Sequence, residues 1–422
     1  MKKLRTIETF VGAGGSFTGF KKAGFECVYA NDIDTDFLKT LVFNNPELEK
    51  SAMIESTPIE KIDFKKLLLR LNLKKKEIDV IFGGPVCKGY SLAGVRDPSD
   101  IRNTLYRYQL NLIKEFKPKI ALIENVPAMR KSLIVKSEID RNTLRDISYV
   151  WKQLDIFKGI KASLRKKDQH LSDKQQIKYE NIKKKKKQYE ELIKSHSLSV
   201  IDDIEKQLIK IGYRVKIKNL NASWYGSYTK RIRVIIAAVR ADLNEDFIFP
   251  EIKFFDNKNR KDTEFTYSNN LKEPLTIKDA LKLIDYDNKN SIENDIDNKP
   301  MNHDKKSIER FSYIPKGKNF VDVMKSAPKH LHISKFYSRG CTMRLDDNLP
   351  SPTLVPGHSN FPVHPYEHRS ISVREAATIT GFPINYKFFG NHTKRCEQVG
   401  NAVVIQMAYA LAQSCKKILK KL

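Results

Sequence analysis

The sequence is poor in cysteine and in long apolar runs. Its 422 residues contain five cysteines, and none of them forms a Cys-x-x-Cys pair. This usage argues against a structural zinc site or a disulfide framework and fits a reducing compartment, so we expect a cytoplasmic protein. The longest clean apolar run, Val234 to Val239, is far too short to cross a bilayer. The first residues run directly into a strand-like segment, so we predict no secretion signal.

Acidic residues are also in short supply. Asp and Glu number 50 against 77 Lys and Arg, which gives a formal net charge of +27. Such an excess predicts a polyanionic partner, with nucleic acid as the first candidate and an anionic membrane surface as the second. Four histidines lie close to the carboxyl end, but their spacing is loose and Pro-rich: His358, His364, His368 and His392. We expect exposed loop positions for them and no metal site.

A cysteine follows one of the predicted strands. Val80 to Phe82 is a short apolar run typical of a buried parallel strand, and Gly83-Gly84-Pro85 ends it in a tight loop. The loop presents Cys87 at the carboxyl end of the strand, where open α/β sheets bind ligands. The nearby cations Lys88 and Arg96 favour the thiolate, which is the nucleophilic form. The alternative is a small buried apolar residue, as most free cysteines are.

A glycine turn separates the first predicted strand from the first predicted helix. Thr6 to Val11 is the strand, Gly12-Ala13-Gly14-Gly15-Ser16 the turn, and Phe17 to Gly24 the helix. A dinucleotide fingerprint would need a third glycine where Phe17 stands, so the ligand is not held by a pyrophosphate. A nucleoside with a carboxylate, such as S-adenosylmethionine, fits better. An ordinary tight turn is the alternative.

Two further predicted strands end in acids. Asp32 stands at the tip of Glu26 to Ala30, about 20 residues beyond the glycine turn, where a carboxylate can accept hydrogen bonds from ribose hydroxyls. Glu124 directly follows the apolar strand Ile120 to Ile123. Apolar surroundings raise the cost of its charge, which makes it a candidate proton donor. The alternatives are a helix N-cap or a solvated loop acid.

Two arginines lie two residues apart on a later strand. We predict strands over Gly212 to Lys218, Asn221 to Gly226 and Thr229 to Ile236. Because side chains alternate along a strand, Arg231 and Arg233 share one face. Two guanidiniums on a buried strand need an anionic or acceptor-rich partner.

The remaining chain suggests an insertion and a second domain. Residues 131–200 are rich in Lys and read as helical, projecting from the core; the run Lys183 to Lys187 is either a solvated charge run or a non-specific phosphate contact. From about residue 243 we predict a smaller domain of strands and loops. Its interleaved basic and aromatic residues fit either nucleic-acid contact or a small core with a solvated rim. A final apolar helix follows Val403.

Taken in order, these segments resemble a cytosine carbon-5 DNA methyltransferase of the bacterial restriction–modification type. The resemblance is colinear and is carried by Phe10 to Gly15, Asn31 to Asp34, Gly83 to Cys87, Arg102 to Tyr106, Glu124 to Val126, Arg231 to Arg233, Arg344-Leu345 with Ser351 to Thr353, Val373 to Ala377, Gly381 to Pro383, and Gln398 to Val403. It implies an α/β fold with a Rossmann-like sheet that binds S-adenosylmethionine, plus a smaller target-recognition domain.

The resemblance also implies roles for individual residues. The catalytic ones are Cys87 as the nucleophile that attacks carbon 6 of a flipped-out cytosine, Glu124 at ring nitrogen 3, and Arg231 and Arg233 at the carbonyl oxygen. Those implied for the cofactor are Phe10, Gly12, Gly14, Gly15, Asp32, Ile33, Pro85, Leu105, Asn401 and Val403. Those implied for DNA are Lys88, Ser91, Arg96 and Arg102.

The implied domains are a catalytic domain over 1–242 with the insertion 131–200, a recognition domain over 243–384, and a segment 385–422 that returns to the catalytic domain. We expect double-stranded DNA as partner, a monomer, and a cognate restriction endonuclease acting on the same site. Lys88 and Thr229 stand where the family usually has Gln. An RNA cytosine methyltransferase of the same fold and a non-catalytic DNA-binding relative are the alternatives.

Overall fold

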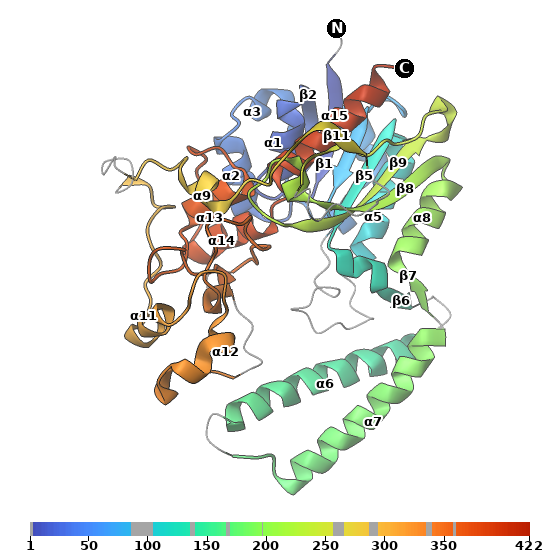
Figure 1. The fold of residues 1–422 in the computed structure, drawn as a ribbon. Coiled ribbons are helices and arrows are strands. Elements are labelled where there is room, and N and C mark those ends of the chain that lie inside the picture. The colour runs from blue at the N-terminus through green and yellow to red at the C-terminus, as the bar shows by residue number, and fades with distance from the viewer. Residues whose placement is uncertain are drawn as a thin grey trace.

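The computed structural model describes residues 3–85, 104–135, 140–165, 169–195, 197–255, 266–286, 294–334, 340–357 and 360–422 (Figure 1). Its centre is a seven-stranded sheet in the order β3-β2-β1-β4-β5-β9-β8. The strands are β1 (Leu4–Thr9), β2 (Phe25–Asn31), β3 (Met53–Glu55), β4 (Val80–Gly83), β5 (Ile120–Asn125), β8 (Tyr213–Asn221) and β9 (Ile232–Arg240). The first five are parallel, and β9 runs antiparallel to both β5 and β8. The predicted α/β class is confirmed.

Alternation along the strands gives the sheet two apolar faces. Ile81 and Ile123 pack on one face with α4 (Phe64–Arg70), α5 (Leu105–Phe116) and α8 (Val200–Lys210). Phe82 and Leu122, one residue away on the same strands, pack on the other face with α1 (Gly15–Lys22) and α15 (Ile405–Leu419). A strand covered on both faces is continuously apolar, which is why these short runs were recognisable in the sequence.

Shorter helices close the β2 end of the sheet. They are α2 (Thr35–Phe43) and α3 (Leu48–Ser51), and their Leu38, Leu41 and Leu48 form a small core with Val11 and Ala30. Asp34 caps α2 by accepting a hydrogen bond from the backbone N–H of Asp36.

The Lys-rich insertion forms a helical hairpin. The helices α6 (Arg141–Arg165) and α7 (Asp173–Ser195) rise from a two-stranded antiparallel ribbon, β6 (Leu133–Val135) with β7 (Ser197–Ser199). In Figure 1 the hairpin extends away from the sheet, and α6 is the helix nearer to it. The predicted helical character is confirmed. No described helix is long and apolar enough to span a membrane.

Strand predictions beyond residue 220 are partly wrong. Asn221 to Gly226 is not a separate strand, because β8 ends at Asn221, whose side chain accepts from the N–H of Ser223 and starts a 3-10 turn over Ala222–Tyr225. The region from 243 is also less stranded than predicted. Its described part has two short paired strands, β10 (Ile252–Phe254) and β11 (Tyr267–Lys272), and otherwise consists mostly of helices, turns and loops.

The helices of this region serve two separate cores. One core joins Phe311, Phe320, Leu331 and Val363 around α11 (Lys305–Ser312) and α12 (Phe320–Val323). The other surrounds α9 (Ile277–Leu281), α13 (Val373–Thr380) and α14 (His392–Asn401) and includes Ala13 of the glycine turn.

Aromatic residues near 250 belong to the large core. Phe247 is buried beside the α15 face of the sheet and stacks edge-on with Phe249, with centroids 5.1 Å apart. A Cβ on Gly226 would meet the Phe254 ring at 2.9 Å, and Phe255 packs on Trp224 and Tyr267. The structure therefore places aromatic residues of this stretch in the core of the main sheet and not in the separate small core that was predicted.

The carboxyl-terminal helix α15 returns to the amino-terminal half, as predicted. It lies along α1 (Figure 1), and a Cβ on Gly19 would be only 2.5 Å from the Cβ of Ala408. The glycine therefore permits a close helix–helix approach that a larger residue would prevent.

Candidate active site

The ends of two neighbouring strands lie side by side at the carboxyl edge of the sheet. β4 ends at Gly83 and is followed by Gly84 and Pro85, and β5 ends in Glu124 and Asn125. The Asn125 side chain donates to the carbonyl of Pro85 at 2.9 Å, and this bond fixes the start of the predicted nucleophile loop. A Cβ on Gly84 would stand 3.2 Å from Oε2 of Glu124, so the glycine leaves room for the carboxylate beside that loop. Asn125 is a positioning residue that the sequence did not reveal.

Glu124 is buried and paired with Arg233. Its Oε1 lies 2.7 Å from Nε of Arg233, and the two side chains are 10% and 9% exposed. Burial lowers the pKa of Arg233, and the adjacent Glu124 charge partly offsets this effect. The antiparallel β9 brings the pair together, because it aligns Glu124 with Ile235 and Asn125 with Val234. The predicted acid and one predicted arginine thus form one site.

Arg231 shares the face of Arg233 but has different partners. Its Nη1 donates to the carbonyls of Gly400 at 2.8 Å and Leu354 at 3.2 Å, which joins two distant segments to β9. Its buried Nε has no hydrogen-bond acceptor among the described residues. Burial, and then repulsion from Arg233, lower the pKa of Arg231 well below its usual range. The pair of guanidiniums would therefore be stabilised by an acceptor-rich or anionic ligand.

Thr229 is a structural contact in this protein. Its side chain is buried. The Thr229 hydroxyl lies within hydrogen-bond distance of two backbone carbonyls, that of Ser351 at 3.1 Å and that of Pro352 at 3.2 Å. The backbone N–H of Lys230 also donates to Ser351, at 2.7 Å. The place where the family usually has Gln is therefore used to attach the chain around 351 to β9.

The glycine turn and Asp32 lie together at the neighbouring edge. The N–H of Gly12 donates to Oδ2 of Asp32 at 2.8 Å, and that of Asp34 donates to Oδ1 at 3.0 Å. Burial raises the pKa of Asp32, and the two backbone donors partly offset it. The space around a Cβ on Gly12 is open to 4 Å, and Ile33 beside Asp32 is 67% exposed.

The residues at this edge suit a nucleoside. Asp32 offers a carboxylate to ribose hydroxyls, and the exposed Ile33 offers an apolar surface to a flat base. Phe10, half-buried, precedes the turn with a positive φ of 55°, a strained conformation for a non-glycine residue. Such strain is often kept at ligand sites.

The other residues predicted to bind the cofactor differ in environment. Gly15 packs on the carboxyl-terminal segment, since its Cβ would be 2.2 Å from the Val403 carbonyl, and the space beside Gly14 is filled by Leu41 and Tyr386. Asn401 is exposed, Val403 and Leu105 are half-buried, and Pro85 is buried. The backbone of Val403 thus lies beside Gly15 of the glycine turn.

Five predicted residues lie outside the described ranges. They are Cys87, Lys88, Ser91, Arg96 and Arg102. The structure places the chain on either side of them, at Pro85 and Thr104.

Glu8, also not predicted, is a buried acid close to the glycine turn. It is fully buried on β1 and accepts a hydrogen bond from Ser16 Oγ at 2.6 Å. Burial raises the pKa of Glu8 from 4.5 to about 7.

Glu55, another acid at a strand end, lies at the end of β3. It accepts a hydrogen bond from the Tyr29 hydroxyl at 2.7 Å and forms an ion pair with Arg70 at 3.2 Å.

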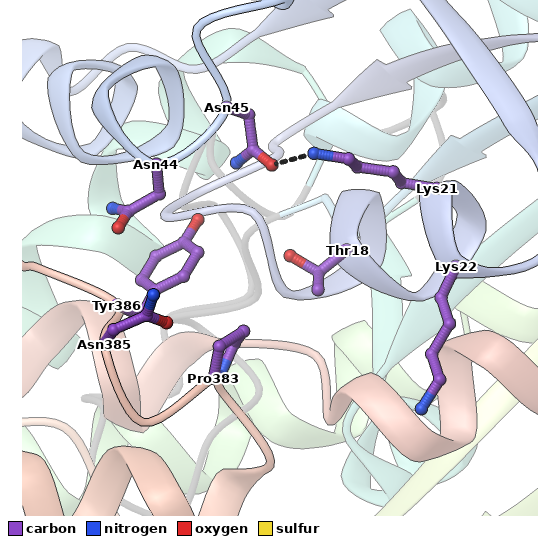
Figure 2. Close-up of a pocket in the computed structure, with 8 residues that line it drawn as sticks. All are labelled: Thr18, Lys21, Lys22, Asn44, Asn45, Pro383, Asn385 and Tyr386. Atoms are coloured by element: carbon purple, nitrogen blue, oxygen red, sulfur yellow. Dashed lines mark hydrogen bonds between the residues drawn. The ribbon is translucent and has the colours of Figure 1, made fainter.

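A hollow of about 300 Å³ lies elsewhere, between α1 and the chain after α13 (Figure 2). Thr18, Lys21, Asn45 and Tyr386 are among its lining residues, and none of the residues predicted for catalysis or cofactor lines it. Lys21 is already engaged there by Asn45 at 2.8 Å, so the hollow is not the predicted site.

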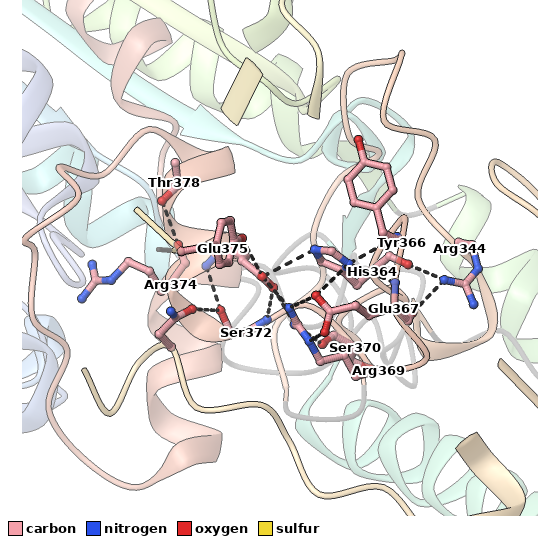
Figure 3. Close-up of polar contacts among 12 residues, drawn as sticks. Arg344, His364, Tyr366, Glu367, Arg369, Ser370, Ser372, Arg374, Glu375 and Thr378 are labelled. Atoms are coloured by element: carbon pink, nitrogen blue, oxygen red, sulfur yellow. Dashed lines mark hydrogen bonds and ion pairs between the residues drawn. The ribbon is translucent and has the colours of Figure 1, made fainter. Parts of the chain in front are cut away.

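Buried polar contacts hold the segments beyond residue 340 (Figure 3). Arg369 forms two bonds to the buried Glu375, at 2.7 and 2.8 Å, and Glu375 completes a capping box with Ser372 at the start of α13. Arg344 donates to backbone carbonyls of Phe311, Ile314, His364 and Glu367. His364 is buried within this network, so the prediction of an exposed position was wrong. In the described part of the chain, no cluster of His, Cys, Asp or Glu is placed to hold a metal.

Comparison with known proteins identifies the family of the chain. The family model for C-5 cytosine-specific DNA methylases matches residues 4–152 and 179–417. The chain belongs to the C-5 cytosine-specific DNA methylase family. Its activity is DNA (cytosine-5-)-methyl transfer, and the family uses S-adenosylmethionine as methyl donor.

Relatives of the methylase align over almost its whole length. The type II methyltransferase M.DdeI of Desulfomicrobium norvegicum is 26% identical, over 97% of this chain and 88% of its own. The Escherichia coli type II methyltransferase M.Eco47II is 25% identical, over 99% of this chain and 79% of its own. A shorter alignment with M.AgeI of Thalassovita gelatinovora reaches 42% identity over 29% of this chain and 28% of its own.

Solved structures share the fold of the methylase. A prophage-encoded Escherichia coli protein assigned as a DNA modification methyltransferase superposes with a TM-score of 0.63 at 21% identity, covering 99% of this chain and all of that one. The DNMT2 of Spodoptera frugiperda superposes with a TM-score of 0.54 at 13% identity, over 98% and 100% of the two chains. The predicted fold and family are confirmed.

The family match leaves out one part of the methylase. Residues 153–178, between the two matched ranges, comprise the second half of α6 and the beginning of α7. The outer part of the hairpin is therefore an addition to what the family has in common.

Proposed function

We propose that this methylase acts through a covalent bond between Cys87 and carbon 6 of a cytosine flipped out of duplex DNA. The observation that carries the proposal is the buried pair of Glu124 and Arg233 at 2.7 Å, beside Pro85 of the strand end that leads to Cys87. A base inside a duplex cannot reach such a buried pair, so it must leave the stack.

Each residue then has one task. The Cys87 thiolate adds to carbon 6 while Glu124, after taking up a proton from water, passes it to ring nitrogen 3, which accepts the displaced electron pair. Carbon 5 becomes nucleophilic and takes the methyl group as the methyl–sulfur bond of the donor breaks, with the electron pair of that bond staying on sulfur. Loss of the carbon 5 proton to water re-forms the double bond between carbons 5 and 6 and expels the thiolate, and ring nitrogen 3 returns its proton to Glu124.

The two arginines stabilise charge during addition. Arg233 holds Glu124 in place and can donate to the carbonyl oxygen of the base, where negative charge develops. The free Nε of Arg231 is a second donor on the same face of β9, although the rest of its guanidinium is committed to Gly400 and Leu354. We assign Arg233 to the base and Arg231 mainly to positioning.

S-adenosylmethionine, when bound, supplies the methyl group from its sulfonium centre. We propose that Asp32 accepts the ribose hydroxyls and that Phe10 and Ile33 flank the adenine. The backbone at Gly12, Gly14 and Gly15 leaves room for the ligand, and Pro85, Leu105, Asn401 and Val403 complete the site. The open space at Gly12 and the exposed Ile33 support this assignment.

The biological role follows from the relatives, which are type II methyltransferases. We propose that the protein is the modification enzyme of a restriction–modification system, a monomer whose cognate endonuclease cuts the same unmodified sequence. Residues 243–384 form the recognition domain in this proposal, and 385–422 return to the catalytic domain. The separate core around α11 and α12 supports a recognition unit.

The test uses duplex DNA in which 5-fluorocytosine replaces cytosine. Fluorine cannot leave as a cation, so the adduct formed after methyl transfer persists and survives denaturing electrophoresis. We expect a methyl-labelled protein–DNA adduct with the parent enzyme and with the control Cys341→Ala, and none with Cys87→Ala. Transfer to tRNA alone, or an adduct with Cys87→Ala, would contradict the proposal.

A further inference from the structure

The α6–α7 hairpin has a core of its own. Its two helices pack through buried apolar residues of both: Ile147, Val150, Trp151, Leu154, Phe157, Ile182 and Ile193. Lys161 lies 3.7 Å from the Tyr179 ring centroid, and Lys186 lies 5.4 Å from that of Trp151. Such packing fixes the two helices relative to each other, so the hairpin is a stiff arm.

The arm starts at the active-site edge of the sheet. Glu124 and Asn125 end β5, the 3-10 helix Pro127–Lys131 follows, and β6 leads into α6. In Figure 1 the arm extends on the same side of the sheet as α11 and α12, with α6 nearer to the sheet than α7. The arm is therefore joined to the strand end that carries Glu124 by a short stretch of chain, residues 126–140.

One face of α6 is unused by the hairpin core. Arg145, Tyr149, Lys152 and Ile156 recur at spacings of four, three and four residues, opposite the residues that pack on α7. All four are exposed, and Tyr149 and Ile156 keep 56% and 52% of their surface. We call these four residues the α6 stripe.

The charge on the arm is largely uncompensated. The two helices carry fourteen Lys and Arg against six Asp and Glu. Neither cation of the stripe, Arg145 or Lys152, has an ion pair or side-chain hydrogen bond to any residue that the structure describes. At the edge of the sheet, by contrast, Arg233 forms an ion pair with Glu124.

We propose that the α6 stripe binds the sugar–phosphate backbone of the DNA duplex on one side of the target base. Arg145 and Lys152 neutralise phosphates, while Tyr149 and Ile156 pack on the sugars. The arm can follow the duplex for some distance, because a helix of 25 residues is about 37 Å long, or roughly 11 base pairs. The inference rests on the proposed duplex substrate and adds a second contact surface to it.

A membrane surface is the competing polyanion. The arm leaves the sheet soon after the strand that ends in Glu124 and Asn125, and this favours DNA, because DNA must come to that edge for catalysis. Binding to vesicles of anionic phospholipid, with unchanged DNA binding by stripe variants, would assign the arm to membranes and overturn the proposal.

The experiment measures the salt dependence of binding to a 40-base-pair duplex centred on the methylated site, which bisulfite sequencing of DNA from expressing cells identifies first. For Arg145→Gln/Lys152→Gln we expect a roughly tenfold rise in Kd at 0.1 M salt and a slope of log Kd against log salt that falls by about 1.8. The matched control is Lys65→Gln/Lys66→Gln on α4, whose two exposed lysines lose the same charge away from the arm. The control should keep the parent slope.

Two further measurements test position and chemistry. Hydroxyl-radical footprinting should show backbone protection beyond the recognition sequence with the parent and the control, and loss of it on one side with the stripe variant. The charge-conserving variant Arg145→Lys/Lys152→Arg should have the same slope of log Kd against log salt as the parent, because the charge of both positions is kept. A purely structural role of the two side chains would not require this result.

Two outcomes would overturn the proposal. One is a stripe variant whose salt slope and footprint equal those of the parent. The other is an equal rise in Kd and an equal fall in slope in the Lys65→Gln/Lys66→Gln control, which would show that only the net charge of the protein matters. A parent enzyme that methylates no duplex DNA would instead contradict the proposed function, and the footprint would still report on the arm.

Discussion

Charged residues are used in opposite ways at the sheet edge and on the hairpin. At the edge, Glu124 and Arg233 are buried, paired at 2.7 Å and held by strand register. On the hairpin, Arg145 and Lys152 are exposed and unpaired among the described residues. Buried charged residues can take part in a reaction because their positions are fixed. Exposed charged residues attract a polyanion through their electric field, and this attraction tolerates variation in their positions.

The strongest test of this contrast removes the proposed nucleophile, Cys87. Cys87→Ala should lower methyl transfer by at least about 10⁴-fold, because no other group can activate carbon 5. DNA and cofactor binding should persist, as measured by fluorescence anisotropy and calorimetry. Turnover close to that of the parent would remove Cys87 from its role.

Next in size is the acid itself. Glu124→Gln keeps the shape but cannot supply a proton, so we expect turnover to fall by about 10² to 10⁴-fold. Single-turnover methyl transfer at saturating DNA measures the loss. The variant also leaves Arg233 with a neutral partner, so its melting temperature should be compared with that of Glu124→Asp. An unchanged rate would mean that ring nitrogen 3 needs no donor.

A second buried acid sharpens the contrast through pH. Burial raises the pKa of Glu8 from 4.5 to about 7. Below pH 4.5 this pKa shift has no effect on the free energy of unfolding, and as pH rises from 4.5 through 7 it destabilises the fold progressively. Glu8→Gln should therefore gain up to about 3 kcal/mol of unfolding free energy relative to the parent at pH 8, and little at pH 4.5. Urea unfolding at both pH values measures it. A pH-independent difference would contradict the assignment.

Substitution of Arg231 should mainly lower stability, whereas substitution of Arg233 should mainly lower turnover. Arg231→Met removes the donor to both the Gly400 and Leu354 carbonyls, so we expect about 1–3 kcal/mol of lost stability. Arg233→Lys keeps a charge near Glu124 and should mainly lower turnover. Thermal unfolding and single-turnover rates of both variants test the division. Equal profiles would mean that they act as one unit.

The smallest effect is expected on the far side of the hairpin. Lys184, Lys185 and Lys187 are exposed on α7, so replacing all three with Gln should change the unfolding free energy by less than about 0.5 kcal/mol. DNA affinity should weaken less than in the α6 stripe variant. A larger loss than from the stripe would move the contact surface to α7.

Much of the active site could be predicted from local patterns. Strands covered on both faces are apolar throughout, which revealed β4 and β5 and hence the ends that carry Pro85 and Glu124. The common face of Arg231 and Arg233 followed from alternation along β9. The strand at 221–226 was wrong because Asn221 starts a turn through a side-chain bond that propensity does not show.

What local patterns could not show is which partners the charged residues take. Sequence alone indicated most strands of the central sheet, the acids at the ends of two of them and the excess of positive charge, because these depend on neighbouring residues and composition. Only the tertiary structure decided that Arg233 binds Glu124 while Arg231 binds Gly400 and Leu354, and that Thr229 binds Ser351. The reason is that these contacts join residues more than a hundred positions apart: Arg233 meets Glu124 only once β9 lies antiparallel beside β5, and Arg231 and Thr229 meet their partners only once the chain beyond residue 350 has packed against this region.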